Sequence, residues 1–183
     1  MKCKFVLYIT FALTLSACNN GNQKELLSEI DEMETTLDSL NVVANDTTRY
    51  GTKNIVTSVR ETILKVKKHY TTDTIDYELA NQMNSYKEIR KGLSKNTSNL
   101  TKVKLTIPEV QAKLSDLKHD VENGINDRDK YKEFVNYEKT KIFEISEVLS
   151  YYLETSKMFY DRYDSLHPII KNLGDSLELH AND

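Results

Sequence analysis

The chain has 183 residues and a formal net charge of -3, so the molecule as a whole carries no field that would attract a polyanion. Charged residues make up 29% and hydrophobic residues 39%, with five glycines, two prolines and no tryptophan, which suits helices with charged faces better than a thick globular core. The only cysteines, Cys3 and Cys18, lie near the N-terminus, so no intrachain disulfide is expected in the rest of the chain.

The N-terminus has the pattern of an export signal. Lys2 and Lys4 precede a short apolar run over residues 5–15, and small residues lead to Cys18. The run is too short for a membrane span, which needs about 20 apolar residues.

Residues 15–18, Leu-Ser-Ala-Cys, resemble the bacterial lipobox. The resemblance implies a signal peptide over residues 1–17, cleaved before Cys18, and acyl chains such as palmitate on that cysteine. Residues 18–23 would then form a lipid anchor and polar tether. An ordinary signal peptide is the alternative, but it would leave a free thiol in an oxidising compartment. Residues 19–22 carry no acidic sorting signal, which favours the periplasmic face of the outer membrane.

Residues 24–72 are predicted to form a short helical pair. The first helix, at about 24–44, is acidic; the second, at about 53–70, is basic. We expect the two to pack antiparallel and to neutralise each other, with a nucleic-acid or lipid-headgroup surface on the second helix as the alternative.

Residues 73–183 contain two heptad tracks of fourteen positions each, which predict a long antiparallel coiled-coil hairpin with its turn near 123–127. The first track is Ile75, Leu79, Gln82, Tyr86, Ile89, Leu93, Asn96, Leu100, Val103, Ile107, Val110, Leu114, Leu117 and Val121. The second is Tyr131, Val135, Glu138, Ile142, Ile145, Leu149, Tyr152, Ser156, Phe159, Tyr163, Leu166, Ile170, Leu173 and Leu177.

The ends and interruptions of these helices follow from local signals. Asp73 or Thr74 is expected to cap the third helix, and Asn126 or Asp127 the fourth. Pro108 predicts a kink in one continuous helix, with a restart at residues 106–109 as the alternative. Pro168 is likewise expected to kink or restart the fourth helix near its end.

A turn centred near Asn126 makes facing positions sum to about 252. Asn96 and Ser156 then share one polar core layer, which would specify the register. Leu114 faces Glu138, whose carboxylate is expected to lean out into solvent. Gly92 is expected to lie opposite the aromatic segment Tyr152–Tyr163 and to leave room for a ring or a small cavity.

A second apolar stripe on the fourth helix predicts a second partner. Around Val148–Met158 that partner is expected to be the first two helices. Phe134 and Tyr137, near the turn, are candidates for a docking surface or a homodimer contact, with core packing as the alternative. The turn residues Asn123, Gly124 and Arg128 complete this candidate interaction tip.

No pattern for catalysis or cofactor binding is found: there is no nucleotide-binding glycine loop, no His-Glu-x-x-His and no Gly-x-Ser-x-Gly. His119 and its acidic neighbours near the turn are interpreted as solvated charges rather than a metal site. We therefore expect no enzyme, cofactor or metal. Asp73-Thr74-Ile75 resembles the O-glycosylation motif of Bacteroides-type bacteria, which makes Thr74 a candidate modification site.

Together these features predict an all-α, elongated four-helix arrangement, in which the short helical pair packs at the base of the long hairpin. The layout resembles small helical lipoproteins of Bacteroides-type bacteria. We expect a non-enzymatic, membrane-anchored scaffold or adaptor that binds an envelope protein and no nucleic acid. A periplasmic carrier or chaperone that holds apolar ligands between helices is the alternative, and pairing of heptads between chains leaves a homo-oligomer open.

Overall fold

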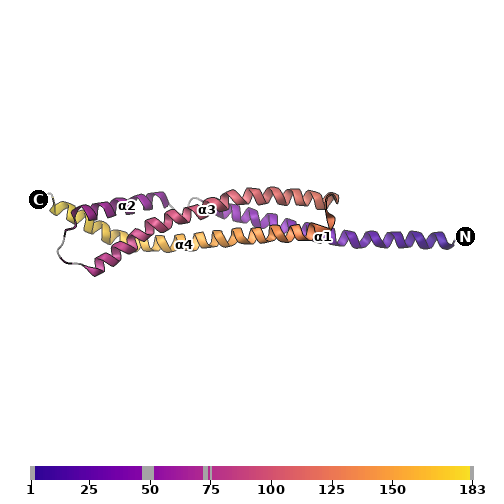
Figure 1. Ribbon diagram of the computed structural model, residues 1–183, viewed down its shortest axis with the longest axis horizontal. Coiled ribbons are helices and arrows are strands. Elements are labelled where there is room, and N and C mark those ends of the chain that lie inside the picture. Colours follow the sequence, from indigo (N-terminus) through magenta and orange to yellow (C-terminus); the bar gives the residue numbers. More distant parts are fainter. Residues whose placement is uncertain (1–2, 47–51, 72–73, 75, 182–183) are drawn as a thin grey trace. The chain divides into compact units, whose positions relative to one another are not determined.

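The computed structural model describes residues 3–46, 52–71, 74 and 76–181, with side chains from residue 21 onward, and every regular element in these residues is helical. The elements are α1 (Cys3–Asn45), α2 (Thr52–His69), α3 (Tyr77–Asn123), the 3-10 helix η1 (Arg128–Lys130) and α4 (Tyr131–His180) (Figure 1). The long helices pack against each other, so the predicted all-α, four-helix fold class is confirmed.

The helices are shared between two compact units. Unit 1 combines Met1–Val43 with Lys104–Ser146, and unit 2 combines Ala44–Val103 with Glu147–Asp183. Each unit therefore holds one of the two shorter helical segments and one part of the α3–α4 hairpin. This differs from the expected short helical pair, because α1 and α2 belong to different units.

The core of unit 1 is a three-helix seam. Its residues recur at heptad spacing, so each helix turns one apolar stripe inward. The buried side chains are Leu26, Ile30, Met33 and Leu37 of α1, Ile107, Val110, Leu114, Leu117 and Val121 of α3, and Tyr131, Val135, Ile142 and Ile145 of α4. All the α3 and α4 members lie on the predicted tracks.

The core of unit 2 is built by α2, α3 and α4. Its main cluster consists of Val59, Ile63, Val66, Met83, Tyr86, Ile89, Leu93, Phe159 and Ile170. Met83 is buried where the track predicted Gln82. Val148, Tyr151 and Met158 remain 36–60% exposed, so the prediction that the first two helices cover them is wrong.

Among the described residues, acidic side chains of α1 pair with lysines of the α3–α4 hairpin and not with α2. In unit 1, Lys118 of α3 pairs with Asp31 at 2.6 Å and Glu34 at 2.8 Å, and Lys139 of α4 lies 3.8 Å from Glu29. Hydrogen bonds from Lys118 to Asp31, and to a lesser extent to Glu34, raise the pKa of Lys118 above its ordinary value. The expected neutralisation of the basic helix by the acidic one is therefore wrong.

The helix ends differ from the predicted caps. Asp76 Oδ1 accepts the backbone N–H of Leu79 at 3.0 Å and so caps α3. Thr74 lies in a bend, and Asp73 lies outside the described residues. Asp127 precedes η1 without a side-chain cap bond, because its carboxylate pairs with Lys130 at 2.9 Å instead.

Both prolines lie inside continuous helices. Pro108 lies within α3 and Pro168 within α4, and both side chains are exposed. The single-helix interpretation of the third helix is confirmed, and the restarts considered at either proline are wrong. Each helix continues through its proline because the heptad phase is unbroken there. Burial of the seam on both sides of the proline stabilises the helix by more than the loss of one backbone hydrogen bond costs.

The segment that was expected to form a polar tether is helical instead. Residues 19–23 continue the helical backbone of α1. Gln23 Nε2 donates to the carbonyl oxygens of Val121 at 2.7 Å and Glu122 at 3.1 Å. These bonds satisfy carbonyl groups that the last turn of α3 leaves without a helical partner.

Glu138 is buried, contrary to the expectation that it leans into solvent. Its side chain is 7% exposed, and Oε2 has no hydrogen-bond partner among the described residues. Its place on the predicted seam accounts for this, since the helix presents every track position to the core.

Candidate functional site

The turn that closes the hairpin in unit 1 is built around two left-handed residues. Gly124 has φ +60° and Asn126 has φ 64°. The backbone N–H of Ile125 donates to the carbonyl of Asp120 at 3.1 Å, the bond that closes a Schellman-type helix end. The predicted role of Gly124 past the end of the helix is confirmed.

The remaining turn residues brace this loop. Asn123 Nδ2 donates to the carbonyl of His119 at 2.8 Å. The guanidinium of Arg128 lies over Gly124 and donates to its carbonyl oxygen. A Cβ added at residue 124 would lie 2.6 Å from a guanidinium nitrogen of Arg128. Asn123, Gly124 and Arg128 therefore build the turn, and their polar groups are engaged inside it.

Tyr131 ties the start of α4 to the same loop. Its hydroxyl donates to the carbonyl oxygen of Asp120 at 2.7 Å and also contacts that of Ile125. Asn126 Nδ2 donates to the Asp120 carboxylate at 2.7 Å. Burial raises the pKa of the Tyr131 hydroxyl, so it remains a donor at neutral pH. These bonds hold the first turn of α4 in place.

Two aromatic side chains of the candidate tip are exposed beside this braced turn. Phe134 is 40% exposed and Tyr137 is 54% exposed. Lys141 Nζ lies 5.5 Å from the centroid of the Tyr137 ring, a cation–π distance. We call Phe134, Tyr137 and Lys141 the tip surface.

The other predicted residues lie elsewhere. In unit 2, Asn96 Nδ2 donates to Ser156 Oγ and to the Tyr152 carbonyl, both at 2.8 Å, the pairing that the register predicts. Thr74 is exposed in the connection between α2 and α3. The side chain of Cys18 lies outside the described residues.

A groove between α3 and α4 of unit 2 lies beside this polar layer. The ring of Phe159 occupies the space in which a Cβ on Gly92 would lie, so the expected room opposite Gly92 is filled by a ring. The groove is lined by Gly92, Lys95, Asn96, Asn99, Tyr151, Thr155, Met158 and Phe159. We call it the α3–α4 groove.

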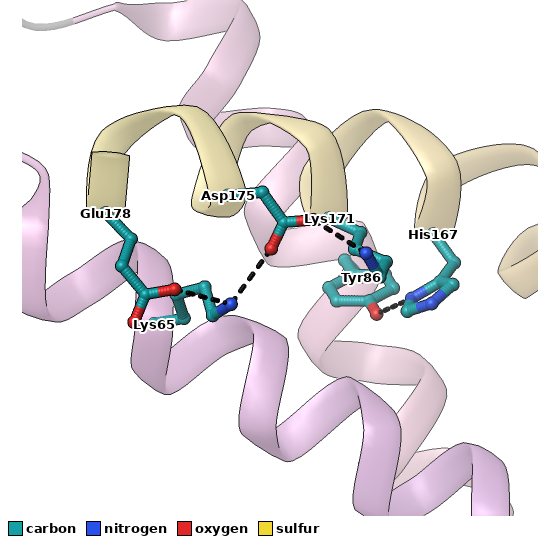
Figure 2. A network of polar contacts seen from close by, with 6 residues as sticks. All are labelled: Lys65, Tyr86, His167, Lys171, Asp175 and Glu178. Carbon is teal, nitrogen blue, oxygen red and sulfur yellow. Dashed lines mark hydrogen bonds and ion pairs between the residues drawn. The ribbon is translucent and has the colours of Figure 1, made fainter. Parts of the chain in front are cut away.

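Unit 2 also contains a buried aromatic network that sequence reasoning missed. The hydroxyl of Tyr86 lies 2.5 Å from His167 Nδ1, and the ring of Tyr163 stacks on His167 with centroids 4.5 Å apart (Figure 2 shows the Tyr86–His167 pair). Burial raises the pKa of Tyr86 to about 12 and lowers the pKa of His167, so both groups are neutral near pH 7. The facing rule predicts that Tyr86 meets position 166, next to His167.

An ion-pair cluster joins α2 to α4 nearby. Lys65 Nζ lies 2.9 Å from both Asp175 and Glu178, and Lys171 pairs with Asp175 at 2.6 Å (Figure 2). Hydrogen bonds from Lys171 and then Lys65 lower the pKa of Asp175 to about 2. We interpret the ion-pair cluster as a contact that fixes α2 on α4, and the Tyr86–His167 pair as a contact that fixes α3 on α4.

The described residues contain no group of three or more His, Cys, Asp and Glu side chains arranged to hold a metal ion. Within the same residues, no helix is long and apolar enough to cross a membrane. No family model, curated protein or solved structure matches this chain significantly.

Proposed function

We propose that the chain is a non-enzymatic lipoprotein of the bacterial cell envelope, anchored through lipid on Cys18, that acts as a scaffold or adaptor for an envelope protein. The membrane on which we place it is the outer membrane, at its periplasmic face. The export signal and the lipobox-like residues 15–18 support the address.

The observation that carries the adaptor role is the tip surface. A hydrophobic ring and a tyrosine are exposed side by side on α4, next to a turn whose polar groups are held by its own backbone. Tyrosine and phenylalanine are enriched in protein interfaces because they bury a large area at a small cost in side-chain entropy. A rigid support reduces the ordering cost of binding further.

Site-specific photo-crosslinking in cells tests the proposal. A photoreactive residue at Tyr137 is expected to capture one envelope protein, identified by mass spectrometry. Phe143 is the matched control, because it is 64% exposed and lies on the same helix, about two and a half turns past Phe134 and therefore on the opposite side. Capture at both positions, or at neither, would contradict the tip surface as the contact.

Substitution then tests whether the captured contact supplies affinity. The double variant Phe134→Glu/Tyr137→Glu is expected to abolish co-purification of the captured protein. In the proposed complex the rings of Phe134 and Tyr137 are buried against the partner, and the variant would bury carboxylates in their place. Phe143→Glu should leave co-purification unchanged. Undiminished co-purification of the double variant would rule out this surface.

Carriage of an apolar ligand is a second candidate function, favoured by the α3–α4 groove. Tyr151 and Met158 of its lining are 60% and 45% exposed, and the ring of Phe159 lies against Gly92. A fluorescent apolar dye is expected to bind the wild-type monomer saturably and to lose affinity for Met158→Glu, while Phe143→Glu keeps it. Absence of dye binding to the monomer would exclude this function.

A further inference from the structure

Most cations of α2 form no ion pair with the residues that the structure describes. Among the described residues, Lys65 alone of the five α2 cations Lys53, Arg60, Lys65, Lys67 and Lys68 forms an ion pair. Three of the α1 carboxylates that were expected to neutralise these cations, Glu29, Asp31 and Glu34, pair with Lys118 and Lys139 of unit 1. Cations gathered on one surface attract anions from solution.

Arg60 and Lys67 of α2 border a groove in unit 2 together with cations of α3. The groove is lined by Arg60, Ile63, Leu64, Lys67, Lys87, Glu88, Arg90 and Lys91. We call it the basic groove. It carries five cations against the single carboxylate of Glu88, which lies 3.8 Å from Lys91. Because cations stand on both walls, an anion in the groove would be contacted from two sides.

The lining of the basic groove also includes two apolar side chains. Leu64 is 56% exposed and Ile63, its neighbour in the chain, is 8% exposed. An exposed leucine surrounded by cations is suited to an amphiphile, whose charged group contacts the walls while its apolar part covers the leucine.

Two other classes of polyanionic ligand fit the groove less well. Single-stranded nucleic acids are held by aromatic side chains on which bases stack, and the lining contains none. A partner helix would need apolar anchors repeated along the groove. The neighbours of Leu64 on its stripe are all polar: Thr57, Arg60, Glu61, Lys67 and Lys68.

We propose that the basic groove binds the phosphate headgroup of an anionic membrane lipid, with Arg60 and Arg90 contacting the phosphate and Leu64 contacting the apolar part of the lipid. The planar guanidinium groups can each donate two hydrogen bonds to a phosphate, and Lys67, Lys87 and Lys91 add positive charge. This site is separate from the tip surface, and the proposal holds whether or not that surface binds a protein.

Protection of lysine amines measures occupancy of the groove. The full chain is reconstituted with vesicles of phosphatidylcholine alone or of a mixture rich in phosphatidylglycerol, acetylated briefly and analysed by mass spectrometry. With anionic vesicles, acetylation of Lys67, Lys87 and Lys91 is expected to slow several-fold. Lys132, an exposed lysine of unit 1, serves as the internal reference and should react equally in both. High salt should remove the protection, because it screens exposed charges.

Variants separate groove binding from general attraction of the chain to an anionic surface. Arg60→Gln/Arg90→Gln is expected to abolish the protection of Lys67 and Lys87, whereas Lys24→Gln/Lys132→Gln, which loses the same charge, should retain it. All four side chains are exposed, so the fold should survive, and unchanged circular dichroism checks this. Leu64→Ser should weaken protection at unchanged charge.

The other outcomes overturn the proposal. Equal acetylation in both vesicle types would show that no anionic lipid occupies the groove. Protection by soluble glycerol phosphate as strong as that by anionic vesicles would assign the site to a free phosphate. Protection by a poly-glutamate peptide but not by vesicles would assign it to an acidic protein segment. Protection that persists in Arg60→Gln/Arg90→Gln would place the lipid elsewhere.

Discussion

Glu138 is a carboxyl group in the seam of unit 1 whose burial is not compensated by a hydrogen bond at Oε2. Desolvation raises its pKa above the ordinary value of 4.5, and the positive charges of Lys113 and Lys141 oppose this only in part. The folded state therefore holds the proton more tightly than the unfolded state does. A carboxyl group whose pKa is higher in the folded than in the unfolded state lowers the stability of the folded state as pH rises. This loss begins near the pKa of the unfolded state and is complete above the pKa of the folded state.

We expect Glu138→Gln to increase the free energy of unfolding at neutral pH, by about 1–3 kcal/mol if the amide finds partners that the carboxylate lacks. The gain should vanish below pH 4.5, where the wild-type carboxyl group is protonated in both states, and grow as pH rises above it. Urea unfolding of both proteins across this range measures the difference. Exposed Glu133→Gln is the control, and a gain independent of pH would contradict the argument.

At Gly92, the close approach of the Phe159 ring leaves no room for a larger side chain. A methyl group at this position would overlap the ring of Phe159, which is buried against α3. Alanine would otherwise be favoured in the helix by roughly 0.5–1 kcal/mol, while overpacking of a core costs about 1–3 kcal/mol.

We therefore expect Gly92→Ala to lower the free energy of unfolding by about 1–2 kcal/mol in the wild-type chain, as overpacking outweighs helix propensity. In the Phe159→Leu background, which lacks the overlapping ring atoms, the same change should be neutral or stabilising. Chemical denaturation of the four proteins of this double-mutant cycle measures the coupling. Equal effects in both backgrounds would show that the ring does not select glycine.

At the scale of elements, the charged contacts show how α2 is fixed on α4. Lys65 reaches two carboxylates one turn apart, and Lys171 holds one of them from within α4 (Figure 2). Such exposed pairs contribute little each, but a shared cation joins several charges in one network. The lowered pKa of Asp175 shows that the folded state favours its ionised form.

Ionisation of Asp175 stabilises the folded state, whereas ionisation of Glu138 destabilises it. Stabilisation by Asp175 should be complete above its ordinary pKa of 3.8 and be lost as pH falls toward about 2. We expect Asp175→Asn to melt at a lower temperature than the wild type at neutral pH, with the two melting temperatures converging near pH 2. Asp161→Asn, which removes a pair with Lys157 inside α4, is the control and should show a smaller difference. A constant difference down to acid pH would exclude the ion pairs as its cause.

At the scale of the whole molecule, each of the two units contains one part of the α3–α4 hairpin and one further helix, α1 in unit 1 and α2 in unit 2. The chain also presents its candidate contacts in different units: the tip surface belongs to unit 1 and the basic groove to unit 2. An anchored molecule with separate protein and lipid contacts would act as a link rather than as a catalyst. Attachment to the membrane is the property on which this role depends most.

We expect Cys18 to carry that attachment. Native protein should have an intact mass that begins at Cys18 and includes acyl chains, and should incorporate a palmitate analogue supplied to the cells. Cys18→Ser should lose the label, while Cys3→Ser, which alters a residue of the expected signal peptide, should keep it. A native mass that includes residues 1–17, or label retained in Cys18→Ser, would contradict the lipoprotein assignment.

Hexose increments in the same mass spectrum would report on Thr74. Their loss in Thr74→Ala would assign the modification to that residue. Lipid increments without any hexose would exclude it.

The sequence by itself determined the helices, the turn and the register. Apolar residues at heptad spacing specify which side of a helix is buried, Gly124 marks where α3 must end, and the alignment of Asn96 with Ser156 follows from counting out from the turn. These are properties of one helix or of two adjacent helices, so the pattern is sufficient. The exposure of Phe134 and Tyr137 was left open, because residues off the seam can also pack against a further helix.

Only the tertiary structure decided which helix covers which part of the hairpin. Hydrophobic burial is not directional, and the apolar stripes of α1 and α2 could pack with each other or with any open face of the seam. Once α1 packs with residues 104–146, Glu138 is buried, Asp31 and Glu34 of α1 pair with Lys118, and Arg60 and Lys67 of α2 line the basic groove. Each of these outcomes depends on a contact between residues far apart in the chain, which no local pattern specifies.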